Sequence, residues 1–172
     1  LGIPKPQIHL GLSGGSHGAM TGAMLAGIEA ALTRVKPVLV IVLGDTNSTL
    51  AGALAAAKLH IPVAHVEAGL RSFDMTMPEE VNRRVTDILS DLLFATSPEA
   101  VGHLAREGVA ADRIRLVGNP MIDTLLANLD RFDAERQRAA LGLGDAPYAV
   151  ATLHRPANVD LPEAARRLVA ML

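Results

Sequence analysis

The sequence predicts an α/β protein built on a parallel β-sheet. Short apolar segments rich in β-branched residues alternate along the chain with helical segments of roughly 10–15 residues. This order is typical of βαβ units, whose right-handed crossovers leave consecutive strands parallel. The strand segments are mostly apolar and show no clean alternation of polar and apolar residues. We therefore expect strands that are buried on both faces.

The first elements follow from local signals in the sequence. A helix rich in Ala and Leu is predicted to begin at the Gly-rich segment 13–18 and to end near Val35. A β-branched strand is predicted at 37–44. The polar residues after it offer several N-caps for an Ala-rich helix at about 49–59. The next strand is predicted at 61–67.

The alternation continues through the middle of the chain. Pro78 stands at a first-turn position and is followed by two acidic residues, which predicts a helix that runs to about Asp91. Further elements are predicted in turn: a strand at 92–96, a helix that begins at 97–99, a strand at 113–118 and a helix at 121–129.

The most polar stretch, 130–145, is the best candidate for a domain boundary. It contains a charged segment that predicts a polar helix or a connector. A new strand is predicted at 148–154, and Pro162 begins a last helix. We therefore predict an N-terminal domain at 1–143 and the beginning of a second domain at 144–172.

The composition excludes several classes of function. The chain has 172 residues, of which 49% are hydrophobic, and this predicts a globular protein. A net charge of −2 and 2% aromatic residues offer no surface for nucleic acid. No apolar segment is long enough to span a membrane. The absence of cysteine excludes thiolate metal sites and fits a cytoplasmic protein, and no histidine has metal-ligand spacing. We expect neither a metal nor a cofactor.

Charged side chains follow three of the predicted strands. Asp45, Glu67 and His154 each stand where an apolar segment ends. The carboxyl ends of parallel strands share one edge of a sheet, and ligands bind in the crevice outside that edge. We therefore expect these side chains to converge on a small-molecule site that carries out proton transfer.

Two of these residues have structural alternatives. Asp45 could cap the following helix, an interaction that contributes about 1 kcal/mol. Glu67 could pair with nearby Arg71 or His65. If it is buried and unpaired, its carboxylate costs several kcal/mol or takes up a proton, which suits general acid–base catalysis near neutral pH.

Other polar residues give weaker signals. Glu79 and Glu80 would stabilise the dipole of a helix in its first turn, typically by about 0.3–1 kcal/mol, and basic residues four positions further on suit pairing along the helix. His154 and Arg155 together are typical of an anion clamp. Asn119 favours a turn between a strand and a helix over a site, although its location suits a site.

Taken together, these motifs resemble the non-hydrolysing UDP-N-acetylglucosamine (UDP-GlcNAc) 2-epimerases. The resemblance is carried in order by VLGDTNSTLAGALAAAKLHIPVAHVEAGLRSFDMTMPEEVNRRVTDILSDLLFATS, LVGNPMIDTL and ATLHRPANVD. It implies two Rossmann-like domains in a GT-B arrangement, with substrate in the cleft between them. It also implies a cytoplasmic homodimer that interconverts UDP-GlcNAc and UDP-ManNAc for cell-envelope polysaccharide biosynthesis.

The resemblance assigns roles to residues of this sequence. The implied route is anti-elimination of UDP to give 2-acetamidoglucal, followed by re-addition with C2 inverted. Which carboxylate acts as base and which as acid stays open. The catalytic residues are implied to be Asp45, Glu67, Glu79 and His154. Substrate contacts are predicted for Gly44, Thr46, Arg71, Arg83, Asn119 and Arg155.

Members of this family are about twice this length, so we expect a fragment, truncated at both ends and inactive by itself. Three other functions are compatible with parts of the pattern. Hydrolysing relatives release ManNAc and UDP from the same intermediate. A GT-B glycosyltransferase shares the architecture but does not need three converging carboxylates. A non-catalytic module would bind the nucleotide sugar without turnover.

Overall fold

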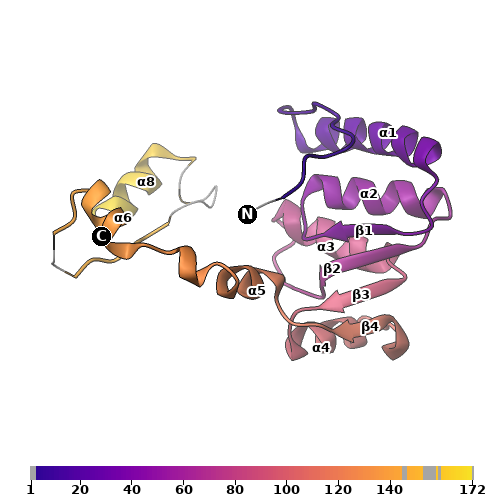
Figure 1. Cartoon of the computed structure of the whole chain (residues 1–172). Coiled ribbons are helices and arrows are strands. Elements are labelled where there is room, and N and C mark those ends of the chain that lie inside the picture. Colours follow the sequence, from indigo (N-terminus) through magenta and orange to yellow (C-terminus); the bar gives the residue numbers. More distant parts are fainter. Residues whose placement is uncertain (1–2, 145–146, 153–157, 159, 172) are drawn as a thin grey trace. The chain divides into compact units, whose positions relative to one another are not determined.

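The chain forms two compact units, Leu1–Ala127 and Asn128–Leu172, in a computed structural model that describes residues 3–144, 147–152, 158 and 160–171 (Figure 1). The first unit contains a four-stranded parallel sheet in the order β1-β2-β3-β4. Each strand lies beside the next one along the chain, as right-handed βαβ crossovers predict. The predicted α/β fold class and parallel sheet are confirmed. The predicted domain boundary after residue 143 stays a prediction.

The elements of the first unit follow the predicted order. The strands are β1 (Val40–Leu43), β2 (Val63–Ala68), β3 (Leu92–Ala95) and β4 (Ile114–Leu116). The helices are α1 (His17–Val35), α2 (Asn47–Lys58), α3 (Pro78–Leu89), α4 (Pro98–Arg106), η1 (Ala111–Arg113) and α5 (Pro120–Leu126). Helices described in the second unit are η2 (Leu129–Arg131), α6 (Ala134–Ala140) and α8 (Pro162–Val169).

Side-chain caps begin three of the helices that follow the strands, α2, α4 and α5. The Thr46 side chain accepts a hydrogen bond from the amide of Thr49 and caps α2. Ser97 caps α4 and Asn119 caps α5 in the same way. A cap satisfies a backbone N–H that has no partner within the helix, which is why these helices begin where they do. Asp45 therefore does not cap α2, and its carboxylate is available for other contacts.

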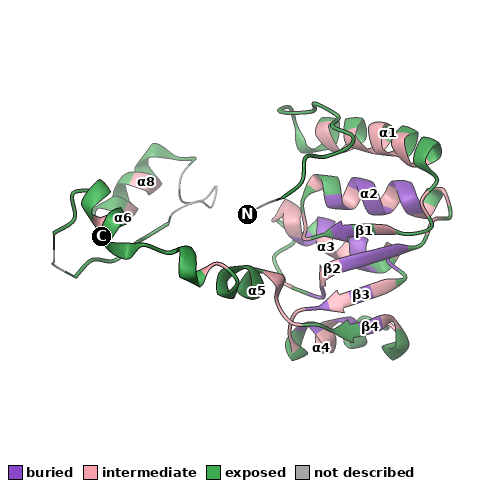
Figure 2. Cartoon of the chain, viewed as in Figure 1, coloured by how far each residue is buried: buried purple, intermediate pink, exposed green. Residues whose placement is uncertain are grey.

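The hydrophobic core lies on one face of the sheet and forms two clusters. One joins α2 to the first two strands, with Val42 and Val63 against Ala53 and Ala56. The small side chains of α2 let this helix approach the sheet closely. Figure 2 shows the buried segments concentrated in β2 and α2. The other cluster joins α4 to the last strands through Ala68, Leu93, Ala95, Ala100, Leu104 and Ile114.

The prediction of burial on both faces is wrong for β1. Ile41 is 64% exposed and Leu43 is 59% exposed, whereas Val42 between them is buried. Successive side chains of a strand point to opposite faces, so one face of β1 packs against α2 and the other meets solvent. In the described part of the chain, β1 is an edge strand and no helix covers Ile41 and Leu43.

The prediction of a strand at 148–154 is also wrong for residues 148–152, the part of this segment that the structure describes. Residues 147–152 adopt no strand, and Val150 is 80% exposed. A strand needs a neighbour to pair its backbone N–H and C=O groups, and the described residues of this unit offer none. His154 and Arg155 lie outside the described residues. None of the described helices is both long enough and apolar enough to cross a membrane.

Candidate active site

Asp45 lies at the carboxyl end of β1 and is held there by backbone and side-chain contacts. Its carboxylate forms an ion pair with Arg83 of α3. Its carbonyl accepts a hydrogen bond from Asn82 Nδ2 at 2.9 Å. The preceding Gly44 has φ +70° and donates its N–H to the Val66 carbonyl at 3.0 Å. The turn after β1 is therefore fixed against both β2 and α3.

Glu67 lies beside this turn, in an irregularity of β2. Its φ is +71°, and the pairing of β2 with β3 shifts register between Val66 and Ala68. A Cβ atom placed on Gly44 would be 3.3 Å from Glu67 Oε2, so the absent side chain of Gly44 makes room for this carboxylate. A β-bulge re-aims a side chain in this manner, and bulges are frequent next to active sites.

Glu67 is half-buried, and within the described residues its carboxylate has no hydrogen bond or ion pair. The alternatives of a pair with Arg71 or with His65 are therefore not realised. Both of those side chains contact Asp87 instead. The Glu67 carboxylate therefore lies near Asp45, and no described side chain competes with a ligand for it.

The two glutamates at the start of α3 have different surroundings. Glu80 is fully buried and accepts hydrogen bonds from Ser72 N at 2.8 Å, Ser72 Oγ at 3.0 Å and Phe73 N at 3.3 Å. Burial alone would raise the pKa of Glu80, but the hydrogen bonds from Ser72, with the charge of Arg83 and the Phe73 amide, outweigh it and lower this pKa. Glu80 therefore anchors the loop before α3.

Glu79 is half-buried, and its side chain has no hydrogen bond or ion pair in the described part of the chain. The alternative of pairing over four residues is not realised among the described residues. Arg83 pairs with Glu80, three residues away, at 3.3 Å, and Arg84 contacts Met75 Sδ. Arg83 turns toward Asp45 and Glu80 because these carboxylates lie on the buried side of α3. Glu79 remains free to face a ligand.

Arg71 belongs to a buried network of charges beneath the loop. Its guanidinium contacts Asp87 Oδ2 at 2.7 Å and Glu107 Oε2 at 2.6 Å, and its side chain is fully buried. Burial alone would lower the pKa of Arg71, but the hydrogen bonds that its guanidinium donates to Glu107 and the charge of Asp87 outweigh it and raise this pKa. His103 adds a hydrogen bond from Nδ1 to the Gly69 carbonyl at 2.9 Å. The loop after β2 is thus tied to α3 and α4.

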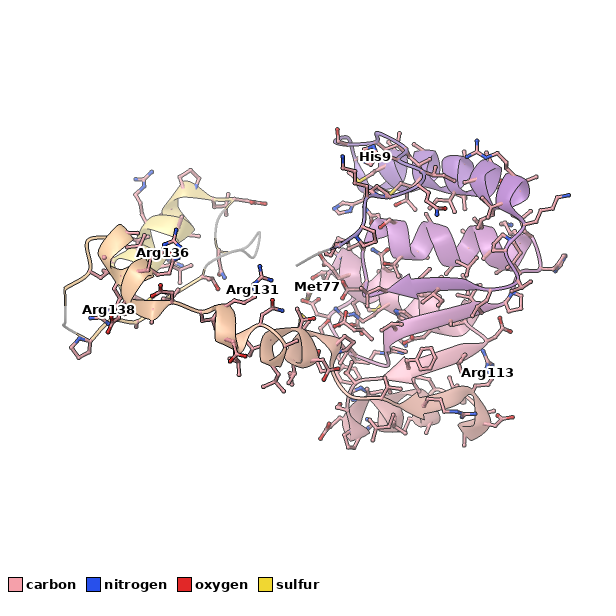
Figure 3. The ribbon with its side chains drawn as sticks, viewed as in Figure 1. His9, Met77, Arg113, Arg131, Arg136 and Arg138 are labelled. Atoms are coloured by element: carbon pink, nitrogen blue, oxygen red, sulfur yellow. The ribbon has the colours of Figure 1, made fainter. Side chains whose placement is uncertain are left out.

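Sequence reasoning missed Asp87, the residue at the centre of this network. It contacts His65, Gly69 and Arg71. One signal was available: Asp87 lies seven residues after Glu80, so both fall on the same side of α3. Two predicted substrate contacts, Thr46 and Asn119, have the capping roles given above. Figure 3 labels Met77 at the edge where the strands end and Arg113 at the opposite edge.

These features define a class of protein. A parallel α/β sheet with free carboxylates at its carboxyl edge is the arrangement of Rossmann-like proteins that bind a small molecule at the strand ends. A sequence model of one family, described as UDP-N-acetylglucosamine 2-epimerase, matches residues 1–172. The chain belongs to the UDP-N-acetylglucosamine 2-epimerase family, and the resemblance to this family found in the sequence is confirmed.

Curated relatives support this assignment. The chain is 48% identical over 172 residues to a UDP-N-acetylglucosamine 2-epimerase of Methanocaldococcus jannaschii, with 98% of this chain and 47% of the relative covered. It is 52% identical over 165 residues to a UDP-2,3-diacetamido-2,3-dideoxy-D-glucuronate 2-epimerase of Pseudomonas aeruginosa, with 94% and 45% covered. The chain thus spans about half the length of these relatives.

Solved structures have the same fold. The UDP-GlcNAc 2-epimerase of Methanocaldococcus jannaschii, in complex with UDP-GlcNAc and UDP, matches with a TM-score of 0.89 and 46% identity over 98% of this chain and 47% of that one. A UDP-N-acetylglucosamine 2-epimerase of Rickettsia bellii matches with a TM-score of 0.78 and 31% identity over 83% and 38%. These matches confirm the predicted Rossmann-like fold of the GT-B type.

Proposed function

We propose that the whole protein carrying this chain is a non-hydrolysing UDP-GlcNAc 2-epimerase. The observation that carries the proposal is the placement of Glu67, a carboxylate with no described partner, beside the Gly44–Asp45 turn at the carboxyl edge of the sheet. Membership of the epimerase family supports the substrate class, and the Methanocaldococcus jannaschii relative was solved with UDP-GlcNAc and UDP.

The proposed reaction removes and returns one proton. A base takes the proton from C2 while the bond from C1 to the UDP oxygen breaks, which gives 2-acetamidoglucal and UDP. The UDP oxygen then adds back to C1, and C2 receives a proton on the opposite face. Because the C2 proton is weakly acidic, a positioned base and stabilisation of the leaving group must act together.

The surroundings of the carboxylates suggest how they share this work. Glu67 and Glu79 have no described partner, so they are the groups available to move protons. The Asp45 carboxylate pairs with Arg83, so its position is fixed by α3. His154 is proposed to act with them from outside the described residues. The proposed substrate contacts are Gly44, Thr46, Arg83, Asn119 and Arg155. The sequence also predicted Arg71, but its side chain is buried against Asp87 and Glu107, so we propose that it positions the loop after β2 instead.

Further properties belong to the same proposal. The whole protein would be a cytoplasmic homodimer that interconverts UDP-GlcNAc and UDP-ManNAc for cell-envelope polysaccharides. Residues 1–143 would belong to its N-terminal domain and residues 144–172 to its second domain.

Turnover of UDP-GlcNAc by the whole protein in heavy water tests the reaction. We expect deuterium at C2 of both epimers and no accumulation of free UDP. Free UDP together with ManNAc would indicate a hydrolysing enzyme. Turnover without deuterium would contradict the elimination route, and binding of UDP-GlcNAc without turnover would indicate a non-catalytic module.

Substitution of Glu67 tests its role within this reaction. Glu67→Gln should lower kcat by about 100-fold or more, because the amide cannot carry a proton to or from C2. Glu29→Gln is the matched control, since Glu29 is an exposed glutamate of α1. Equal rates in the two variants would exclude Glu67 from the chemistry.

A second substrate has a specific observation in its favour. The Pseudomonas aeruginosa relative, 52% identical, is named for a diacetamido uronic acid sugar and not for UDP-GlcNAc. Both names describe inversion at C2, so the same carboxylates would serve either substrate. Comparison of kcat/KM for the two nucleotide sugars decides between them, and we expect UDP-GlcNAc to have the higher value.

A further inference from the structure

His65 and Asp87 form a buried pair directly beneath the proposed site. His65 Nδ1 lies 2.6 Å from Asp87 Oδ1, and both side chains are essentially without solvent contact. The other ring nitrogen, Nε2, lies 2.8 Å from the carbonyl oxygen of Gly44. The imidazole of β2 therefore bridges α3 and the turn that follows β1.

The partners of His65 determine where its protons are. A backbone carbonyl oxygen can only accept a hydrogen bond, so Nε2 must carry a hydrogen. Asp87 also accepts from Gly69 N at 3.1 Å and pairs with Arg71 at 2.7 Å, contacts that favour the ionised carboxylate. An ionised carboxylate likewise only accepts, so Nδ1 must carry a hydrogen as well.

The contacts of this pair surround both proposed catalytic carboxylates. Through His65, Asp87 holds the carbonyl of Gly44, the residue before Asp45. Asp87 also makes direct contacts on both sides of Glu67. It pairs with the side chain of His65, two residues before Glu67, and accepts a hydrogen bond from the amide of Gly69, two residues after it. One carboxylate thus fixes the backbone on both sides of the β2 bulge and the turn after β1.

We infer that Asp87 holds His65 as an imidazolium and that the two are positioning residues for Asp45 and Glu67. Neither side chain contacts the substrate in this arrangement. Arg71 lies between Asp87 and Glu107 and completes this row of charges. The inference about positioning rests on the proposed epimerase function, whereas the inference about the protons of His65 does not.

NMR of the 172-residue chain tests the protonation state. Long-range ¹⁵N–¹H correlation spectra near neutral pH should show hydrogen on both ring nitrogens of His65. In Asp87→Asn the asparagine amide can donate to Nδ1, so only Nε2 should keep its hydrogen. An imidazole with one bare nitrogen in the unsubstituted chain would overturn the inference.

Kinetics of the whole protein test positioning. Asp87→Asn should lower kcat by about 100-fold with KM unchanged, because misplaced catalytic groups affect the transition state more than binding. Asp91→Asn is the matched control: Asp91 accepts from Val63 N at 2.9 Å at the other end of β2. It should change kcat by less than about twofold.

Equal kcat values in the two variants would overturn the positioning role. A whole protein that binds UDP-GlcNAc without epimerising it would instead overturn the proposed function. In that case the NMR spectrum of His65 would still test whether both of its ring nitrogens carry hydrogen.

Discussion

At the scale of single residues, backbone conformation places the two carboxylates of the proposed site. Gly44 and Glu67 both have positive φ values, which cost little for glycine but are strained for glutamate. Strain of this kind persists where surrounding contacts enforce it and is frequent at functional sites. Here the enforcing contacts come from His65, Asp87 and the Gly69 amide.

Substitution of Gly44 tests this account. Gly44→Ala should lower the free energy of unfolding by about 1–2 kcal/mol, because alanine is strained at φ +70°. It should also lower kcat of the whole protein, because the new Cβ would lie 3.3 Å from Glu67 Oε2. Urea denaturation and steady-state kinetics measure both effects.

Gly102→Ala is the control for this substitution. Gly102 lies inside α4 with no atom within 4 Å of an added Cβ. It should stabilise the helix by up to about 1 kcal/mol and leave kcat unchanged. Similar results for the two variants would contradict the role assigned to Gly44.

Glu80 provides a prediction about pH. The pKa of Glu80 in the folded state lies below its ordinary value of 4.5. The stabilisation of the fold by the ionised Glu80 carboxylate is therefore fully present above pH 4.5, and it is lost as the pH falls through the folded-state pKa. Glu80→Gln should therefore be less stable than the unsubstituted chain by about 2 kcal/mol at pH 7, and this difference should shrink toward pH 3. Urea denaturation between these pH values measures it.

The neighbouring glutamate supplies the matched control. Glu79→Gln should show no such pH-dependent difference, because the Glu79 side chain has no described partner. A difference for Glu80→Gln that is the same at pH 3 and pH 7 would contradict the assigned hydrogen bonds.

At the scale of elements, α3 organises the proposed site. Three side chains on its buried side make these contacts. Glu80 binds the loop between β2 and α3, and Arg83 pairs with Asp45. Asp87 binds His65 of β2 and the amide of Gly69 at the start of the same loop. A helix presents residues three, four and seven apart on one side, so a single element reaches all these segments. The loop between β2 and α3 is held by polar and charged contacts to α3.

Arg71 tests the contribution of these charges. Arg71→Met should lower the free energy of unfolding by about 3–5 kcal/mol, because it leaves Asp87 buried with one partner fewer and releases Glu107. Urea denaturation of the 172-residue chain measures the loss. Arg106→Met, at an exposed arginine of α4, is the control and should change stability by less than about 0.5 kcal/mol. Equal losses would mean that the buried network contributes nothing.

At the scale of the whole molecule, the chain provides part of a proposed catalytic cleft. It spans 47% of the Methanocaldococcus jannaschii relative, and one face of β1 is open to solvent. Free carboxylates alone do not catalyse the proposed reaction, because the leaving UDP must also be bound and its charge stabilised.

The 172-residue chain should therefore not convert UDP-GlcNAc by itself, whereas the whole protein should. Separation of the two epimers after incubation measures conversion in both samples. The Glu67→Gln variant of the whole protein is the control for background conversion. Activity of the 172-residue chain above that background would contradict the prediction.

The sequence by itself determined the order of the elements and most helix starts in the first unit. Thr46, Ser97 and Asn119 begin their helices through contacts with residues two or three positions further on, which a local pattern can specify. Short apolar segments between the helices likewise predicted the four strands of the sheet. The sequence also identified Asp45 and Glu67 as neighbours, since consecutive parallel strands end at one edge.

Only the tertiary structure decided which charged side chains are engaged in contacts that stabilise the fold and which stay available for a ligand. Glu79 and Glu80 are adjacent and chemically alike, yet the loop that folds back onto Glu80 buries one and leaves the other free. Asp87, 22 residues from His65 along the chain, becomes its partner only when α3 packs on β2. Local patterns cannot specify such contacts, because their free energy depends on burial and on partners brought together by folding.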